Sequence, residues 1–308
     1  MSDCTRVDAV LGRLLPPVET AATRFQPRWL VFALSEFIVF GIKQAWACLF
    51  GGLMVAGIIA SALWWPADSP IARYDALFVY AIGIQLVFLL TGLERLAEGR
   101  VILVFHIVGT VMEVFKTGAG SWVYPEPSLL RVGDVPLFSG FMYAAVGSYI
   151  ARVIRVFDLR FPGYPRRRWT IPLAVLIYVN FFTHHYVWDL RWLLFGYTIV
   201  LFWRTRAVYR VWRWHHEMPM LVGFSLVAFF IWLAENVGTI TRTWVYPDQA
   251  ETWTMVSPSK FGSWFLLMII SWVLVTLVHR PVRRLDDQHA GNPILPLGAL
   301  PSRFNAER

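Results

Sequence analysis

The sequence has little charge and almost no cysteine, and it lacks the motifs of common soluble enzymes. Only 16% of its 308 residues are charged, whereas ordinary soluble domains carry about 25%. Its two cysteines, Cys4 and Cys48, cannot build a disulfide framework, and we expect free thiols. The patterns G-x-x-x-x-G-K-[ST], H-E-x-x-H, G-x-S-x-G and C-x-x-C are missing. These absences argue against nucleotide and serine hydrolysis, and no cofactor or metal is predicted.

Apolar residues dominate what is present. The chain is 57% hydrophobic, with 16 Trp and 23 Phe, which is more apolar surface than one globular core can hide. The net charge of +8 comes from arginines between the apolar runs. Arginines in such places are typical of membrane topology signals and not of a nucleic-acid groove. We therefore predict an integral membrane protein surrounded by a lipid bilayer, with no nucleic-acid partner.

Eight segments approach the length of about 20 mostly apolar residues that a spanning helix needs. They are 44–65, 74–93, 101–119, 136–154, 171–189, 190–208, 219–240 and 260–279. The sixth is the weakest, because Arg204 and Arg206 interrupt it. Residues 29–42 contain Glu36 and are too short to cross alone, so we expect an interfacial or half-buried lead-in helix.

One pattern, E-x-x-x-T-x-x-x-x-W-V-Y-P-[ED], occurs twice. It starts at Glu113 and again at Glu235, 122 residues later (235 − 113). The other matched pairs are Thr117 and Thr239, Trp122 and Trp244, Val123 and Val245, Tyr124 and Tyr246, Pro125 and Pro247, Glu126 and Asp248, Pro136 and Pro258, and Gly140 and Gly262. The residues between the matches differ, which argues against mere hydrophobic similarity and indicates a duplication.

The repeat and the arginine distribution together predict the architecture. Arg and Lys are concentrated in alternate loops, which places both termini on the cytoplasmic side. We expect an all-α polytopic membrane protein of eight transmembrane helices, arranged as two parallel four-helix repeats. The repeats cover about 44–154 and 171–279 of a membrane domain at 29–279. Cytoplasmic tails are expected at 1–28 and 280–308.

Glu113 and Glu235 are the candidate catalytic residues. Each precedes its interfacial Trp by nine residues, or about 13 Å of helix, so the carboxyl group lies near mid-membrane. Acids at that depth are costly and are functional candidates for this reason. Thr117 and Thr239 follow on the same helix face, where we expect them to hydrogen-bond the acids.

A structural role for the two acids is the alternative. Lys116 lies three residues after Glu113 and could neutralise it within one helix. The equivalent position in the second copy is glycine, so Glu235 would need a more distant partner such as Lys43 or Arg242.

The aromatic residues of the repeat also allow two interpretations. Trp122, Tyr124, Trp244 and Tyr246 can anchor helix ends at the membrane interface, as aromatic belts do. Their fixed spacing from an acid in both copies favours a second interpretation, in which they form an aromatic mouth that binds a substrate above the acids.

A third candidate group lies at the predicted outer turn between the fifth and sixth spans. It consists of His184, His185, Trp188, Asp189 and Arg191. His185 and Asp189 are four residues apart and would share a helix face, which is acceptable spacing for metal ligands. Histidines that cap a helix at the interface are the simpler interpretation, and a metal or substrate site is the other.

Three stretches of the chain resemble a known family. They are FALSEFIVFGIKQAWACLF, EVFKTGAGSWVYPEPSLLRVGDVPLFSGFMYAAVGSYI and NFFTHH. They are similar to the YoaT-like integral membrane proteins of bacteria, domain of unknown function 817, over about residues 28 to 282. The resemblance implies a multi-pass protein of the bacterial cytoplasmic (inner) membrane, and it supplies no catalytic residues.

The first copy is also similar to a motif of membrane carotenoid hydratases, which pair an intramembrane acid with later Gly, Tyr and Val-Pro residues. The matching residues are Glu113, Gly120, Tyr124, Val135 and Pro136. The second copy departs from this motif at Arg242 and Ser257.

Two functional hypotheses follow, and a third remains open. In the first, an enzyme uses Glu113 and Glu235 as acid and base on an apolar lipid or isoprenoid, with aromatic faces stabilising a cation. In the second, a proton- or cation-coupled transporter of small solutes uses the same acids. The third is a structural membrane subunit, and the oligomeric state is left open.

Overall fold

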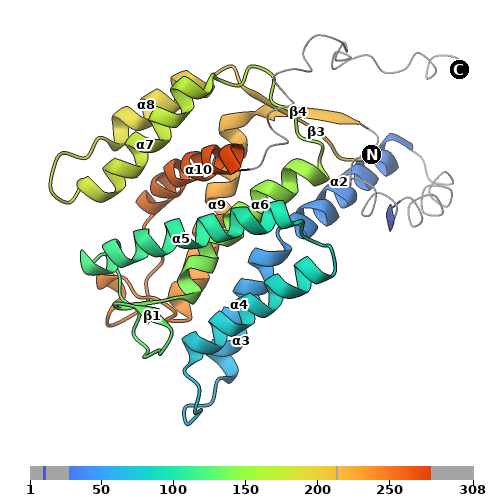
Figure 1. Ribbon diagram of the computed structural model, residues 1–308. Coiled ribbons are helices and arrows are strands. Elements are labelled where there is room, and N and C mark those ends of the chain that lie inside the picture. The colour runs from blue at the N-terminus through green and yellow to red at the C-terminus, as the bar shows by residue number, and fades with distance from the viewer. Residues whose placement is uncertain (1–9, 12–27, 213, 279–308) are drawn as a thin grey trace, which may run out of the picture.

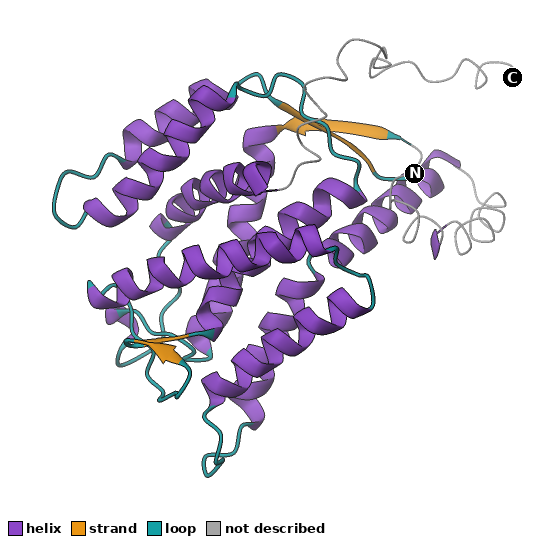
Figure 2. Ribbon diagram, viewed as in Figure 1, coloured by secondary structure: helices purple, strands orange, loops and turns teal. Residues whose placement is uncertain are grey.

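The computed structural model describes residues 10–11, 28–212 and 214–278, and most of the described chain is helical (Figures 1 and 2). The helices are α2 (Arg28–Ala47), α3 (Leu49–Trp64), α4 (Arg73–Leu90), α5 (Leu96–Gly118), α6 (Phe138–Val156), α7 (Arg167–Thr183), α8 (Arg191–Phe202), α9 (Met220–Ile240) and α10 (Ser259–Val278). Two antiparallel hairpins pair β1 (Arg131–Val132) with β2 (Val135–Pro136), and β3 (Arg206–Arg210) with β4 (His215–Pro219). The hairpins lie at opposite ends of the molecule (Figure 1).

Five described helices are long and apolar enough to cross a membrane. They are α2 (from Leu30), α4, α5, α9 and α10. Helices α3 and α8 are apolar but shorter. The predicted class, a mainly helical membrane protein, is confirmed at this level. The eight crossings, the orientation, the parallel repeats and the domain limits stay predictions. The predicted tails lie largely outside the described residues.

The first helix differs from the prediction. Residues 29–42 were expected to be too short to cross, whereas α2 continues to Ala47 and is 20 residues long. Helix α2 contains two charged residues, Glu36 and Lys43, and both side chains are buried. Lys43 is 1% exposed, with its ammonium 5.8 Å from the centre of the Phe157 ring. Glu36 accepts a hydrogen bond from the main chain of the turn between β3 and β4.

The first and sixth predicted spans also have different limits. The segment 44–65 combines the end of α2 with α3, which begins at Leu49 just after the free thiol of Cys48. The segment 190–208 is helical only to Phe202, and its last residues form strand β3. The arginines that interrupt it lie where the chain leaves the helix. Arg206 begins β3, and its main-chain N–H donates to the Pro162 carbonyl at 3.1 Å.

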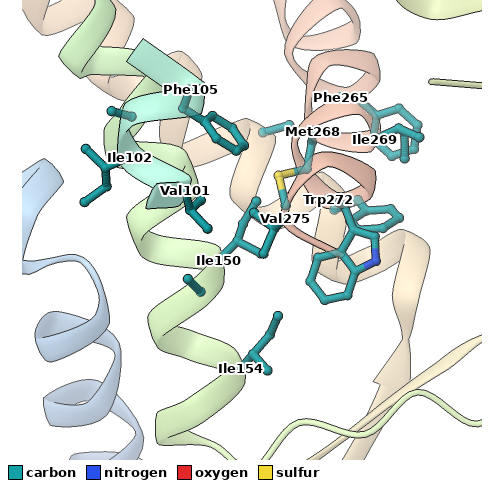
Figure 3. Packing of buried hydrophobic residues seen from close by; sticks show 14 of the residues in the cluster. Val101, Ile102, Phe105, Ile150, Ile154, Phe265, Met268, Ile269, Trp272 and Val275 are labelled. Carbon is teal, nitrogen blue, oxygen red and sulfur yellow. The ribbon is translucent and has the colours of Figure 1, made fainter. Parts of the chain in front are cut away.

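Helices α5, α6 and α10 form the centre of the packing. Figure 3 shows side chains from all three helices gathered together. Those labelled are Val101, Ile102, Phe105, Ile150, Ile154, Phe265, Met268, Ile269, Trp272 and Val275. Gly140 lets α6 approach α5 closely, because a Cβ at this position would overlap the His106 carbonyl group. This packing fixes α5, which carries Glu113.

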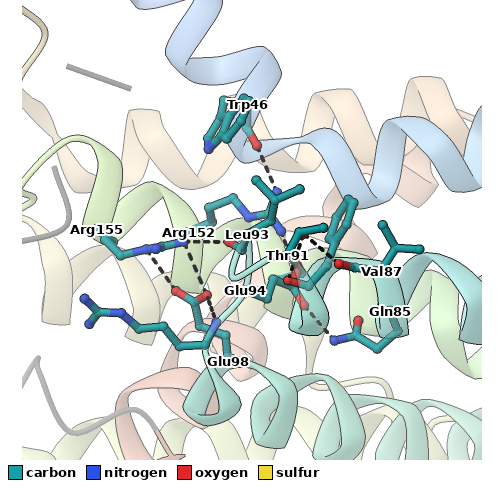
Figure 4. Close-up of polar contacts among 12 residues, drawn as sticks. Trp46, Gln85, Val87, Thr91, Leu93, Glu94, Glu98, Arg152 and Arg155 are labelled. Atoms are coloured by element: carbon teal, nitrogen blue, oxygen red, sulfur yellow. Dashed lines mark hydrogen bonds and ion pairs between the residues drawn. The ribbon is translucent and has the colours of Figure 1, made fainter. Parts of the chain in front are cut away.

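Buried ion pairs connect the turn between α4 and α5 to helix α6 (Figure 4). Glu94 lies 2.7 Å from the guanidinium of Arg152, and both side chains are 1% exposed. Gln85 and Ser148 also donate hydrogen bonds to Glu94, each at 2.7 Å. Arg155 pairs with Glu98 at 3.1 Å. The arginines that indicated topology in the sequence are therefore also partners in buried ion pairs.

Loss of the Arg152 guanidinium is expected to destabilise the fold strongly. Arg152→Met leaves Glu94 buried without its cation, which costs about 3–5 kcal/mol of unfolding free energy. The matched control is Arg160→Met, because Arg160 and Asp158 form an ion pair with both side chains about half exposed. Such surface pairs contribute about 0–1 kcal/mol. Unfolding in detergent micelles measures both, and equal losses would contradict the prediction.

Candidate functional site

The two copies of the repeated pattern bind each other directly. Val123 and Val245 form an antiparallel bridge, in which each main-chain N–H donates to the other residue's carbonyl at 2.9 Å. The two residues are equivalent in the repeat. The segments after α5 and α9 are therefore held together by a reciprocal pair of hydrogen bonds.

Both copies leave their helix through the same backbone turn. Gly120 and Arg242 are equivalent in the repeat, and both have left-handed backbone angles, with φ of +71° and +52°. Two hydrogen bonds of the type that ends helices close each turn. Glycine adopts this conformation freely, whereas Arg242 is strained by about 1 kcal/mol or more. The two copies therefore share the same backbone turn, although one has glycine and the other arginine at this position.

The Glu113 carboxylate is 3% exposed and accepts three hydrogen bonds. The Trp122 indole N–H and the Tyr124 hydroxyl donate to Oε2 at 2.8 and 2.7 Å, and the Tyr143 hydroxyl donates to Oε1 at 2.8 Å. All three donors are neutral. Burial and the neighbouring Glu113 raise the pKa of the Tyr124 hydroxyl well above 10, so it remains a protonated donor at pH 7.

Glu235 has a similar environment and is 4% exposed. The Tyr246 hydroxyl and the Trp264 indole N–H donate to its two oxygens. In both copies the tyrosine follows its acid by 11 residues (124 − 113 and 246 − 235), so the repeated spacing encodes the same hydrogen bond. The indole donors differ, because Trp244 packs over Gly238 and does not bond Glu235.

Aromatic contacts join the two acid sites. The Trp122 and Tyr246 rings meet edge to face with centroids 6.0 Å apart, and Tyr143 lies 6.3 Å from Trp264. Glu113 also interacts electrostatically with Glu235. The structure therefore brings together residues that the sequence placed 122 positions apart (235 − 113).

Both acids line a cavity of about 1160 Å³. The aromatic residues of the repeat that line it are Trp122, Tyr124, Trp244 and Tyr246. Most of the other lining residues are aliphatic or aromatic, among them Met54, Val146, Val227, Phe230 and Leu267. The cavity therefore combines an apolar interior with two acids, as small-molecule sites commonly do.

The two threonines do not contact the acid side chains. The Thr117 hydroxyl donates to the main-chain carbonyl of Glu113 at 2.8 Å, and the Thr239 hydroxyl donates to that of Asn236 at 3.2 Å. Buried helix residues commonly bond the preceding turn in this way. The expectation that these hydroxyls bind the carboxylates is wrong for both copies.

His184 and His185 contact Lys116, and they do not share a helix face with Asp189. Helix α7 ends at Thr183, so His185 and Asp189 lie in a turn and share no helix face. The Lys116 ammonium lies 2.9 Å from His185 Nε2 and 3.5 Å from His184 Nε2. Burial and the nearby lysine lower the pKa of both imidazoles below 6.5, so at pH 7 they are neutral and accept hydrogen bonds from the ammonium.

Asp189 does not line the cavity that contains the two acids. It accepts a hydrogen bond from the Asn180 side chain at 3.1 Å and pairs with Arg191 at 3.3 Å. Both histidines line the cavity, whereas Asp189 does not. No group of three or more His, Cys, Asp or Glu residues suited to a metal ion occurs within the described part of the chain.

Three residues of the site were not expected from the sequence. They are Tyr143, Lys260 and Trp264, whereas Arg191 of the third candidate group also lines the cavity. Tyr143 and Trp264 lie outside the repeated pattern and at positions that are not equivalent, so the repeat carries no signal for them. The predicted ion-pair partners also differ, because Lys116 bonds the histidines and Lys260 is the cation that interacts electrostatically with Glu235.

A family model described as "Protein of unknown function (DUF817)" matches residues 36–272. The chain belongs to this family. It is also 40% identical over 244 residues to "Uncharacterized protein YoaT" of Bacillus subtilis (strain 168), a match that covers 79% of this chain and 91% of the relative. No solved structure matches the chain. The resemblance seen in the sequence is confirmed, and both acids lie within the matched DUF817 region.

The hydrogen bond between Tyr124 and Glu113 is expected to show in a double-mutant cycle. Tyr124→Phe alone lowers the unfolding free energy by about 1–3 kcal/mol, because the buried Oε2 atom of Glu113 loses one of its two donors. In a Glu113→Met background the same change costs less, since the acceptor is already absent. Tyr186→Phe is the control, because Tyr186 is 76% exposed. Equal costs of Tyr124→Phe in both backgrounds would count against the bond.

Proposed function

We propose that this protein holds an apolar or amphipathic small molecule inside its membrane domain and that Glu113 and Glu235 perform acid–base chemistry on it. The cavity of about 1160 Å³ lined by both acids carries this proposal. Its volume exceeds the roughly 300–1,000 Å³ of typical ligand sites, which suits a molecule of lipid size. We place the protein in the bacterial cytoplasmic membrane, with both termini inside.

The chemistry follows from the pairing of the acids. Two interacting carboxyl groups can divide the roles, one donating a proton while the other accepts one. On an isoprenoid double bond, the acid proton would add to one carbon through the π electron pair, and the other carbon would become cationic. The second carboxylate would then remove a neighbouring proton or activate a water molecule that adds to the cation. The ring faces at the site would stabilise that cation.

The environment of Glu113 supports this assignment. Its donors are neutral and come from three different positions, so the carboxyl group is held firmly without an ion pair. A proton donor must be fixed within hydrogen-bond reach of the atom that it protonates. The aromatic contacts between the two copies place the second acid at the same cavity.

Replacing both acids is expected to abolish a membrane product. Glu113→Gln together with Glu235→Gln keeps the size of both side chains but replaces each titratable carboxyl group with an amide, which cannot act as acid or base at neutral pH. Mass spectrometry of host lipids and pigments should detect a species in wild-type membranes that the double variant lacks. Glu251→Gln, at an exposed position, is the control. Identical profiles at matched expression would exclude acid–base chemistry on a host lipid.

Filling the cavity tests binding separately from chemistry. Ala234 lines the cavity, and Ala234→Phe should reduce the amount of any apolar molecule that copurifies with the protein. Ala56→Phe is the matched control, because Ala56 lies on an exposed face of α3 away from the cavity. Equal amounts of copurified ligand in both variants would place the ligand elsewhere.

Transport of a small solute is the second candidate function. The cavity wall extends from Lys260, near the repeated segments, to Tyr209 in the hairpin at the opposite end of the molecule (Figure 1). A wall of this extent favours a path along the helices, and the acids would act as coupling-proton sites.

Coupled transport predicts proton movement in sealed vesicles. A pH-sensitive dye inside the vesicles should report a change when small organic solutes are added outside, and the double glutamine variant should show none. A wild-type signal equal to that of the double variant would exclude coupling through these acids.

A further inference from the structure

Three cations line the apolar cavity at the end that carries the repeated segments. They are Lys116 near the end of α5, Arg191 at the start of α8 and Lys260 in the first turn of α10. The three charges interact electrostatically with one another. Like charges repel, and charges are costly beside apolar walls. Asp189, Glu235 and Asp248 interact favourably with these cations, and an anionic ligand would add to that compensation.

Lys116 is 4% exposed and forms no ion pair among the described residues, although it interacts electrostatically with Asp189. Its contacts are the two neutral imidazoles and the face of Phe181, whose centroid lies 4.2 Å from the ammonium. Glu113, one helical turn before it, is bonded by neutral donors instead. The lysine therefore projects a buried positive charge into the cavity wall without an ion pair.

Lys260 also lacks an ion pair with any residue that the structure describes. Its ammonium lies 4.3 Å from the centre of the Tyr246 ring and 5.8 Å from that of Trp122. The Glu235 oxygens are bonded to Tyr246 and Trp264. Lys260 and Ser259 lie in the first turn of the 20-residue helix α10, whose N-terminal end adds partial positive charge beside the cavity.

Arg191 differs from the two lysines, because Asp189 already pairs with it at 3.3 Å. Two ammonium groups thus remain for a ligand, while the rest of the cavity wall is mainly hydrocarbon. Such a wall would exclude a small hydrated anion but would bind an apolar chain. The site therefore combines the recognition of negative charge with that of a hydrophobic chain.

We propose that the ligand is an amphipathic anion, with a carboxylate or phosphate head bound by Lys116 and Lys260 and a hydrocarbon chain that extends along the cavity. This inference rests on the proposed function, because it names the class of molecule that the same cavity holds. It also orients the ligand, since the head group at the lysines places the first part of the chain beside Glu113 and Glu235.

Binding of matched ligands to the purified full-length protein tests this inference. The probes are a long-chain fatty acid, its methyl ester, an alkyl phosphate of equal chain length and inorganic phosphate. Wild type should bind the fatty acid and the alkyl phosphate at least about tenfold more tightly than the ester. Inorganic phosphate should bind far more weakly than either, because it lacks the chain.

Variants of the two lysines test whether these residues cause the preference for an anionic head group. Lys116→Met with Lys260→Met should abolish the preference, so that the fatty acid binds no more tightly than the ester. Lys260→Arg should keep the preference for the anion. Arg131→Met is the control, because Arg131 is an exposed cation in β1 that does not line the cavity. Should the double variant fail to fold, the wild-type ratio of acid to ester affinity still decides the question.

The outcomes separate this inference from the proposed function. Equal wild-type binding of acid and ester overturns the anionic ligand and leaves an apolar ligand in the cavity. Binding of inorganic phosphate as tight as that of the alkyl phosphate shows a free-anion site and overturns the role of the chain. Failure of every chain-bearing probe to bind removes both the inference and the proposed apolar-ligand function.

Discussion

Two main-chain hydrogen bonds between Val123 and Val245 hold the candidate site together. They join the segments that follow α5 and α9, so the tyrosine of each copy returns to the acid of its own helix. The same pairing brings the Trp122 ring against Tyr246. The cavity beside both acids depends on this contact, because its aromatic wall is built from the paired segments.

Burial of charge in an apolar environment has three different solutions in this protein. Glu94 and Arg152 neutralise each other, and further hydrogen bonds complete the pair. Glu113 is surrounded by neutral donors. Lys116 contacts imidazoles and a ring face. The first solution pairs two opposite charges, which is typical of a structural element. The other two keep a charged or titratable group available at the cavity.

The repeated pattern predicted only part of the site, and the reason is geometric. It identified Glu113, Glu235, Tyr124 and Tyr246, because a fixed spacing of acid and tyrosine along one chain segment encodes a local contact. The pattern carried no information about Tyr143, which reaches Glu113 from a neighbouring helix. It also misplaced the threonine hydroxyls, since a helix offers them carbonyls of its own preceding turn.

Composition and periodicity were enough to determine the class of this protein, because the cost of exposing apolar side chains to water is a property of the residues alone. The repeat determined which residues recur, and the matching turns at Gly120 and Arg242 show that local backbone conformation followed from it. Tertiary structure alone decided that Lys116 faces two histidines and that Lys260 joins the same cavity. Those contacts depend on how helices far apart in the chain pack, and no short-range pattern records that packing.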